Sequence, residues 1–389
     1  MAPLFLDVSH TSHSRARTGV QRVVRALWRE LGAEAVPVTF DPFGRAWRPI
    51  EPWEERNLRS GDAATGRGTH WPLRAQVRGR LRRLGGYTAP MGAPESAGVL
   101  VPEIFTAPTG RALPSLLAGR TGPRVALFHD ALALQFPEFT PTATVARFPS
   151  YLRELLQFDG IAAVSEASRT TLVSYWKWLG VARTPPVVAL PLGIDRPAAT
   201  AASPAASVPT VLCVSTLEGR KNHAALLEAC ETLWAGGTRF QLRLIGLANR
   251  ETGTATVGRI ERLRAAGRKI RYDGPVTDPV LEQAYADCAF TIYPSVAEGF
   301  GLPVAESLLR GKPCLCRMDG ALGEIARPGG CASIRLGAAA DIATALHSLL
   351  TMPAELAALE DAARRRTFRT WSQYVAELRV WMKSLPDNA

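Results

Sequence analysis

Short apolar or β-branched runs alternate with segments of helical periodicity along almost the whole chain. The runs lie near residues 3, 99, 125 and 161 in the first half, and at 211–215, 242–246, 270–274, 290–295 and 313–317 in the second. Strands that alternate with helices in this way are typical of βαβ units, whose strands run parallel. The sequence therefore predicts an α/β protein built on doubly wound parallel sheets.

A break in this rhythm divides the chain near residue 200. Residues 196–208 are rich in Ala, Pro and Ser and have no apolar periodicity, which is typical of a linker. A chain of 389 residues also exceeds the size at which a single hydrophobic core usually stops growing. We predict an N-terminal domain over residues 1–195 and a C-terminal domain over 209–367, both Rossmann-like.

Composition places this protein among ordinary soluble chains. No apolar stretch approaches the roughly 18 residues that a membrane span needs, and the N-terminus has no basic leader followed by a cleavage site. The six cysteines all lie in the second half and form no CxxC pair, so we expect buried, reduced thiols. These features predict a cytoplasmic protein.

The net charge of +11 indicates an anionic partner, which can be nucleic acid, lipid headgroups or a phosphorylated metabolite. Nucleic acid is disfavoured because the sequence has no basic platform interleaved with aromatic residues. Six arginines and no acidic residue lie between Arg67 and Arg83, and the large apolar residues of this stretch recur at helical spacing. A basic amphipathic helix over 72–84 can lie on an anionic membrane surface or approach a lipid-diphosphate acceptor. Alternatively, it is a solvated face packed on its own domain.

The loop from Glu298 to Glu306 carries the strongest chemical signal. It follows a predicted strand, is rich in glycine, and leads into a helix with Pro303 in its first turn. Ligands of open parallel sheets gather at the C-terminal strand ends, and the amides at a helix N-terminus bind anions such as a diphosphate. Two carboxylates beside an anion site fit best as acceptors for sugar and ribose hydroxyls. The loop therefore predicts a nucleotide-sugar site.

An adjacent pair of cations, Arg220 and Lys221, follows the first predicted strand of the second domain. A guanidinium can grip a diphosphate by paired hydrogen bonds, and an ammonium acts on it as a point charge. Such a pair alone is usually a solvated surface feature. Beside the loop of Glu298 we interpret it as a diphosphate clamp.

The two glutamates, separated by seven residues that include GFGLP, resemble the signature of glycosyltransferase family 4, a retaining family of the GT-B superfamily. The resemblance implies two Rossmann-like domains around an interdomain cleft. It implies that Glu298 contacts hydroxyls of the transferred sugar, that Glu306 holds the ribose, and that Arg220 and Lys221 neutralise the leaving diphosphate. It also implies that the segment Gly299, Phe300, Gly301 and Leu302 contacts sugar and phosphate.

Other positions match the same family more weakly, and the resemblance gives each an expected role. In the second domain, Thr216 lies in the motif of the cation pair, while Gly246 and Val276 border the nucleotide. In the first domain, His129 contacts the donor sugar, with Asp130 beside it as an acceptor-side residue or a helix cap. Gly19 opens a helix near the donor phosphate, and Arg22 contacts an anionic group or the acceptor. Residues 368–389 cross back onto the first domain.

The resemblance implies a retaining, metal-independent hexosyltransferase that needs no cofactor besides its nucleotide-sugar donor. The opening TGVQRVVR is similar to bacterial O-antigen and capsule mannosyl- or rhamnosyltransferases, which favours GDP-mannose. The expected acceptor is a saccharide or a lipid-diphosphate-linked saccharide, reached by a protein that is peripheral to the inner face of the membrane. Alternatives are a GT-B phosphorylase or epimerase, a nucleic-acid-binding protein, and a catalytically inactive partner protein.

Overall fold

A computed structural model describes residues 4–14, 16, 18–59, 68–86, 98–195, 200–201, 203, 208–249, 252–335 and 337–386. The chain forms two compact units. The first comprises Met1–Leu134, Pro141–Gly193 and Trp371–Ala389, and the second comprises Gln135–Thr140 and Ile194–Thr370. The sequence analysis placed these divisions at residues 195 and 368 and did not anticipate the short segment Gln135–Thr140. Most of the predicted linker lies outside the described residues.

Within the described residues, the first unit has a seven-stranded sheet with the order β3-β2-β1-β4-β5-β6-β7. Its strands are β1 (Leu4–Asp7), β2 (Ala35–Asp41), β3 (Ala46–Pro49), β4 (Gly98–Val101), β5 (Arg124–Phe128), β6 (Gly160–Ala163) and β7 (Val187–Ala189). All neighbours pair in parallel except β2 and β3. In the middle of the sheet, Phe5 of β1 pairs with Val36 of β2 on one side and with Val99 of β4 on the other.

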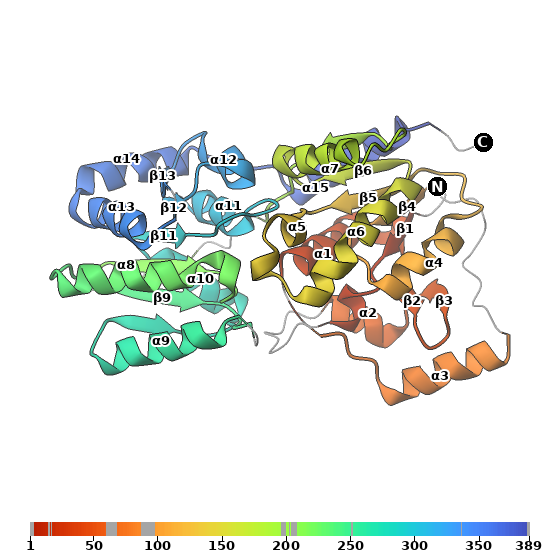
Figure 1. The fold of residues 1–389 in the computed structure, drawn as a ribbon, viewed down its shortest axis with the longest axis horizontal. Coiled ribbons are helices and arrows are strands. Elements are labelled where there is room, and N and C mark those ends of the chain that lie inside the picture. The colour runs from red at the N-terminus through yellow and green to blue at the C-terminus, as the bar shows by residue number, and fades with distance from the viewer. Residues whose placement is uncertain are drawn as a thin grey trace. The chain divides into compact units, whose positions relative to one another are not determined.

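The helices described in the first unit surround this sheet, with α3 (Leu73–Leu84) lying beyond β2 and β3 (Figure 1). They are α1 (Gly19–Leu31), α2 (Pro52–Arg59), α3 (Leu73–Leu84), α4 (Ala107–Leu117), α5 (Leu132–Gln135), α6 (Thr142–Glu154), α7 (Glu166–Trp178) and α15 (Trp371–Lys383). Helix α1 begins with a capping box between Thr18 and Gln21, which satisfies backbone donors that the first turn leaves open. Helix α15, the blue C-terminal helix of Figure 1, packs against α1 within this unit.

The second unit has a parallel sheet of six strands among its described residues, in the order β10-β9-β8-β11-β12-β13. Its strands are β8 (Thr210–Val214), β9 (Gln241–Ile245), β10 (Ile270–Tyr272), β11 (Phe290–Tyr293), β12 (Cys314–Cys316) and β13 (Cys331–Ser333). Its helices are α8 (His223–Ala235), α9 (Thr254–Ala265), α10 (Asp278–Asp287), α11 (Leu302–Leu309), α12 (Gly320–Ala326), α13 (Ala339–Thr351) and α14 (Pro353–Arg364). The predicted doubly wound architecture is confirmed in both units.

Strand order identifies where each unit should bind ligands. From β8 the chain winds outward through β9 and β10, and from β11 it winds the opposite way through β12 and β13. The loops after β8 and β11 therefore diverge and leave a crevice at the carboxyl ends of the strands, which is the usual ligand position in such sheets. The first unit has the equivalent point between β1 and β4.

Two further predictions concern the cysteines and the membrane. All six cysteines lie among the described residues, where each is buried and none forms a disulfide. No single described helix is long and apolar enough to cross a membrane, although α13 and α14, bent by 93°, reach that length and composition as a pair.

Gly246 directly follows β9 and packs closely against the loop that follows β8. Its φ is +144°, and a Cβ at this position would lie 2.0 Å from the carbonyl oxygen of Ser215. Its N–H donates to the carbonyl of Gly274 after β10, at 2.9 Å. Only glycine permits both this conformation and this close approach.

The substitution Gly246→Ala is expected to lower the free energy of unfolding of the second unit by about 3 kcal/mol or more, through backbone strain and overpacking. Gly258→Ala is the matched control because it lies within α9, where the nearest heavy atom to a new Cβ is 3.7 Å away. That control should gain about 0.5–1 kcal/mol. Calorimetry of both variants tests this, and equal stability of the two would contradict the packing role of Gly246.

Candidate functional site

The crevice of the second unit brings together two loops that are far apart in sequence. Arg220 and Lys221 lie in the 3-10 helix η5 (Gly219–Lys221), which follows β8, and Glu298 lies in the loop after β11. The N–H of Val296 donates to the carbonyl of Arg220 at 2.8 Å, so a backbone bond ties the loops together. The cation pair and the glutamate predicted from the sequence therefore share one site.

Four side chains bind the Glu298 carboxylate. Its Oε2 lies 2.8 Å from Nη1 of Arg220, and its Oε1 lies 2.5 Å from Nζ of Lys221. The hydroxyl of Tyr293 donates to Oε1 at 3.0 Å, and the hydroxyl of Ser295 donates to the same oxygen. Because the side chains of Lys221 and Glu298 are each only 9% exposed, this cluster is largely removed from water.

The charges of this cluster balance. Arg220 also pairs with Glu218 at 3.0 Å, so two cations face two carboxylates. Burial raises the pKa of Glu298, but the charges of Arg220 and Lys221 outweigh burial and bring that pKa to about 2. Burial and the nearby Arg220 lower the pKa of Lys221. Glu298 is thus an ionised carboxylate with little tendency to take up a proton.

The glycine-rich loop ends in the N-terminus of α11. Gly301 is the N-cap of that helix at a φ of +110°, where a Cβ would lie 2.8 Å from Cδ2 of Leu322. Phe300 and Leu302 pack their side chains against the apolar cluster that contains Leu322, and Gly299 is buried. The predicted contacts of this segment with sugar and phosphate stay predictions.

Glu306 lies on the second turn of α11 and is buried. The remaining predicted positions of this unit follow neighbouring strands. Thr216 lies half-buried after β8, Gly246 follows β9, and Val276 follows β10 with its side chain packed against the cluster of Leu212. Sheet order thus places these residues along one carboxyl edge with the ion cluster, whereas their ligand contacts stay predictions.

The first unit holds the other predicted residues. His129 is buried after β5, and its Nε2 lies 2.8 Å from the carbonyl of Pro102. A carbonyl only accepts, so Nε2 carries the proton and Nδ1 is the acceptor of the neutral ring. Burial lowers the pKa of His129, which favours this neutral form. Asp130 accepts from the N–H of Leu132 at 3.1 Å, as a cap of α5.

Gly19 and Arg22 lie in the first turn of α1. Gly19 is its first residue and is exposed, and Arg22 is half-buried. The N–H of Arg22 donates to the carbonyl of Thr18 at 3.0 Å, which is an ordinary first-turn bond. Their predicted contacts with donor and acceptor stay predictions.

The sequence analysis missed a pair of buried carboxyl groups at the ligand edge of the first unit. Asp7 ends β1, and Glu103 follows β4, which pairs with β1. Glu103 accepts from the N–H groups of His10 and Thr11 at 2.6 and 2.7 Å, and Asp7 accepts from the N–H of Ser9 at 2.9 Å. Both end apolar runs, LFLD and VLVPE, and that position is a signal the sequence did contain.

The two carboxyl groups influence each other's protonation. Burial, together with the charge of Glu103, raises the pKa of Asp7 from 3.8 to about 7. Burial raises the pKa of Glu103 as well. Asp7 Oδ2 has no hydrogen-bond partner among the described residues, so this oxygen is where a proton would reside. The first unit thus holds a proton at its ligand edge near neutral pH.

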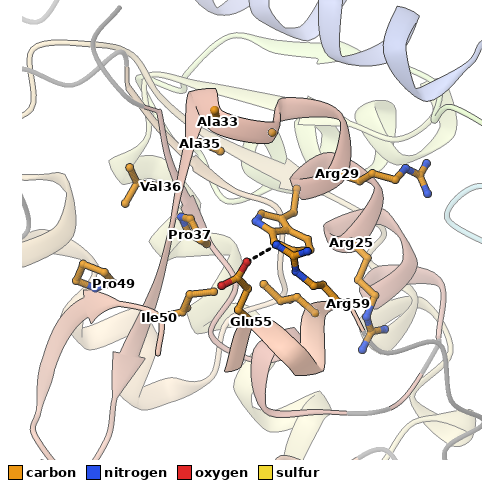
Figure 2. A pocket seen from close by; sticks show the side chains of 13 residues that line it. Arg25, Arg29, Ala33, Ala35, Val36, Pro37, Pro49, Ile50, Glu55 and Arg59 are labelled. Carbon is orange, nitrogen blue, oxygen red and sulfur yellow. Dashed lines mark hydrogen bonds and ion pairs between the residues drawn. The ribbon is translucent and has the colours of Figure 1, made fainter. Parts of the chain in front are cut away.

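A separate cavity of about 860 Å³ lies in the first unit between α1, β2 and α2 (Figure 2). Arg59 lies over the ring of Trp28, with its guanidinium carbon 5.5 Å from the ring centroid, and pairs with Glu55 at 2.6 Å. None of the site residues predicted from the sequence is among the 13 that line it. Among the described residues, no group of three or more His, Cys, Asp or Glu side chains is placed to hold a metal ion.

Comparison with known proteins agrees with this fold. Residues 200–366 match the family model of glycosyl transferases group 1. The serotype-specific mannosyltransferase WbdA of Escherichia coli is 25% identical over 351 residues, covering 83% of this chain and 40% of the relative. The O-antigen chain mannosyltransferase B of Escherichia coli is 29% identical over 213 residues, covering 52% of this chain and 54% of the relative.

Solved structures confirm the fold of the whole chain. The structure of Anabaena HepE in complex with UDP and glucose has a TM-score of 0.69 at 15% identity and covers 99% of this chain and 100% of its own. Two units of this topology are the GT-B fold of its structural neighbours. Residues 200–366 are thus similar to the glycosyl transferases group 1, and the chain is similar to the mannosyltransferases above. It spans about 40% of the length of WbdA.

The raised pKa of Asp7 predicts a pH dependence of stability. Because the folded state binds this proton more tightly than the unfolded state, the stabilisation is complete below the ordinary pKa of 3.8 and is lost as pH rises through about 7. Asp7→Asn keeps an uncharged group at the site and should remove this loss. The melting temperature of Asp7→Asn minus that of the original protein should therefore increase as the pH is raised from 5 to 8.

Thermal denaturation at several pH values measures this difference. Asp361→Asn removes an exposed carboxylate from α14 and controls for the change in net charge. If the melting-temperature difference between Asp7→Asn and the original protein changes no more with pH than that of the control, Asp7 is ionised throughout this range.

Proposed function

We propose that this chain is a retaining glycosyltransferase that moves a hexose from a nucleoside-diphosphate sugar to a saccharide or lipid-linked saccharide acceptor. The observation that carries the proposal is the buried cluster of Arg220, Lys221 and Glu298 at the crevice of the second unit. Mannosyltransferase relatives, one of them an O-antigen enzyme, support mannose as the sugar, GDP-mannose as the donor and a surface polysaccharide as the product.

Donor binding exchanges partners within this cluster. Without a ligand, Glu298 pairs with both Arg220 and Lys221. A diphosphate carries more charge and more acceptor oxygens than one carboxylate, so it competes for both cations. Amides at the N-terminus of α11 add donors and a favourable dipole on the same side of the site. The displaced Glu298 oxygens are then available to accept hydrogen bonds from hydroxyls of the sugar.

The transfer step forms one bond and breaks another. The acceptor hydroxyl oxygen attacks the anomeric carbon, the bond from that carbon to the diphosphate oxygen breaks, and the acceptor proton passes to the departing oxygen. Negative charge grows on the leaving diphosphate, where Arg220 and Lys221 stabilise it. Because the Glu298 oxygens then accept hydrogen bonds from hydroxyls of the transferred sugar, Glu298 is not placed to act as a base or as a nucleophile. Retention therefore proceeds by a front-face route without a covalent enzyme intermediate.

Residues of the first unit have proposed roles of their own. The neutral His129 offers Nδ1 as an acceptor for a hydroxyl of the donor sugar. We assign Arg22 and Asp130 to the acceptor side and Gly19 to the donor phosphate. The proposed enzyme uses protein cations where other transferases use a metal ion, and it needs no further cofactor.

The substitution Glu298→Gln is expected to keep binding of the nucleotide while it lowers the rate of transfer. Loss of the carboxylate leaves Glu218, among the described residues, as the one counter-charge of two largely buried cations, so the ligand-free protein should melt at a lower temperature. The same loss removes the competitor of the diphosphate, so GDP should stabilise this variant at least as strongly as the original protein. Thermal-shift measurements with GDP, UDP and TDP test this, with a gain of about 3 kcal/mol expected at 100 times Kd.

Lys221→Met is expected to lose most of the shift with GDP, because it removes one of the two clamping charges. Lys269→Met, an exposed lysine of the same unit, is the charge-matched control and should keep the shift. A larger shift with UDP or TDP would overturn GDP as the nucleotide, and an undiminished shift in Lys221→Met would overturn the clamp.

Transfer itself is expected to fall at least about 100-fold in kcat for Glu298→Gln, since a sugar-facing contact that strengthens in the transition state is lost. The assay follows mannosyl transfer from GDP-mannose to a mannose-terminated oligosaccharide, with the anomeric configuration of the product read by NMR. An inverted product would overturn retention, and full turnover of Glu298→Gln would remove Glu298 from the catalytic site.

A further inference from the structure

Helix α3 docks on the first unit through its smallest residues. Ala75 and Gly79 are its buried positions. A Cβ on Gly79 would lie 2.8 Å from Cβ of Phe43 and 2.9 Å from Oδ1 of Asp41, so this glycine lets the helix approach the turn between β2 and β3. In Figure 1 the helix lies on the outside of this unit, beyond β2 and β3.

Ion pairs and a cation–π contact fix the rotation of α3 about its axis. Arg78 and Arg82 reach the two oxygens of Glu51, at 3.0 and 3.1 Å. The guanidinium of Arg80 lies over the ring of Phe43 at 5.0 Å. These contacts explain part of the arginine content by packing on the same unit, which is the alternative that the sequence left open.

The opposite face of the helix is apolar and exposed. At about 100° per residue its large apolar side chains fall within one stripe of about 80°, on the side away from Ala75 and Gly79. Their exposed fractions are 77% for Leu73, 52% for Val77, 62% for Leu81 and 83% for Leu84. A contiguous exposed stripe of this kind marks a surface for another partner.

We propose that α3 binds the surface of an anionic lipid bilayer, with this apolar stripe inserted at the level of the headgroups. The helix has no acidic residue. Its exposed Arg74 and Arg83 have no ion-pair partner in the part of the chain that the structure describes, so both are available to lipid phosphates. An apolar stripe flanked by arginines is the composition of helices that lie in a membrane interface.

Other occupants fit these observations less well. A second copy of the chain would set the arginines of one α3 against those of the other, which is unfavourable. A nucleic acid would engage the arginines but leave the leucines in water. A bilayer accommodates both the apolar stripe and the arginines of α3. This inference does not depend on the proposed transferase activity.

Sedimentation with vesicles of phosphatidylcholine and phosphatidylglycerol tests the proposal. We expect binding that weakens in high salt and on pure phosphatidylcholine, because each arginine near an anionic surface contributes electrostatically. Leu81→Gln with Leu84→Gln should lower the partition coefficient about tenfold or more, through loss of buried apolar area. Arg74→Gln with Arg83→Gln should lower it about tenfold on the anionic vesicles.

Matched pairs elsewhere on the chain serve as controls. Leu179→Gln with Val380→Gln removes two exposed apolar side chains, and Arg262→Gln with Arg264→Gln removes two exposed charges from α9. Equal losses in these controls, or no vesicle binding by the original protein, would overturn the proposal. So would a dimer that dissociates in Leu81→Gln with Leu84→Gln while vesicle binding is absent, since a second copy would then be the partner.

A spectroscopic readout locates the contact. Because all six cysteines are buried, Leu84→Cys offers one exposed thiol for an environment-sensitive fluorophore. Its emission should shift to the blue on anionic vesicles, while the same label at Val380→Cys should not change. The reverse pattern would place the membrane contact elsewhere and overturn the assignment to α3.

Discussion

The ion pairs of Glu298 with Arg220 and Lys221 are the constraint on which the second unit depends. Three charged groups lie largely out of water, and each is tolerable only because the others are present. The pairs also join the loops after β8 and β11, which are 77 residues apart. A ligand that enters this crevice must therefore be a better partner for the cations than a carboxylate, and a diphosphate meets that requirement.

The two units repeat one topology with opposite chemistry at their ligand edges. At the central crevice of the second unit the sheet presents a cation pair, whereas at that of the first it presents Asp7 and Glu103. Two carboxyl groups so close together disfavour a further anion. The fold thus supplies two similar frames, and the residues at the strand ends give the second the cations that the proposed donor diphosphate requires.

Helix α3 shows how a single glycine can orient a surface. Gly79 lets the helix lie close to Asp41 and Phe43, and this directs the leucine stripe outward. A larger residue at this position would collide with Phe43 and Asp41. Helical periodicity alone predicted an amphipathic helix but not which side would be buried, because small residues are not recognisable as a packing face in sequence.

By itself, the sequence determined what depends on local pattern: the alternation of strands and helices, the division near residue 200, and the glycine-rich loop before α11. Tertiary structure alone decided which side chains meet. Tyr293 and Ser295 bind Glu298, and Asp7 lies beside Glu103, because parallel pairing brings the ends of distant strands to one edge. The spacing of residues along the chain does not indicate the order of the strands in the sheet. Burial likewise sets the charge states, since desolvation and neighbouring charges exist only in the folded chain.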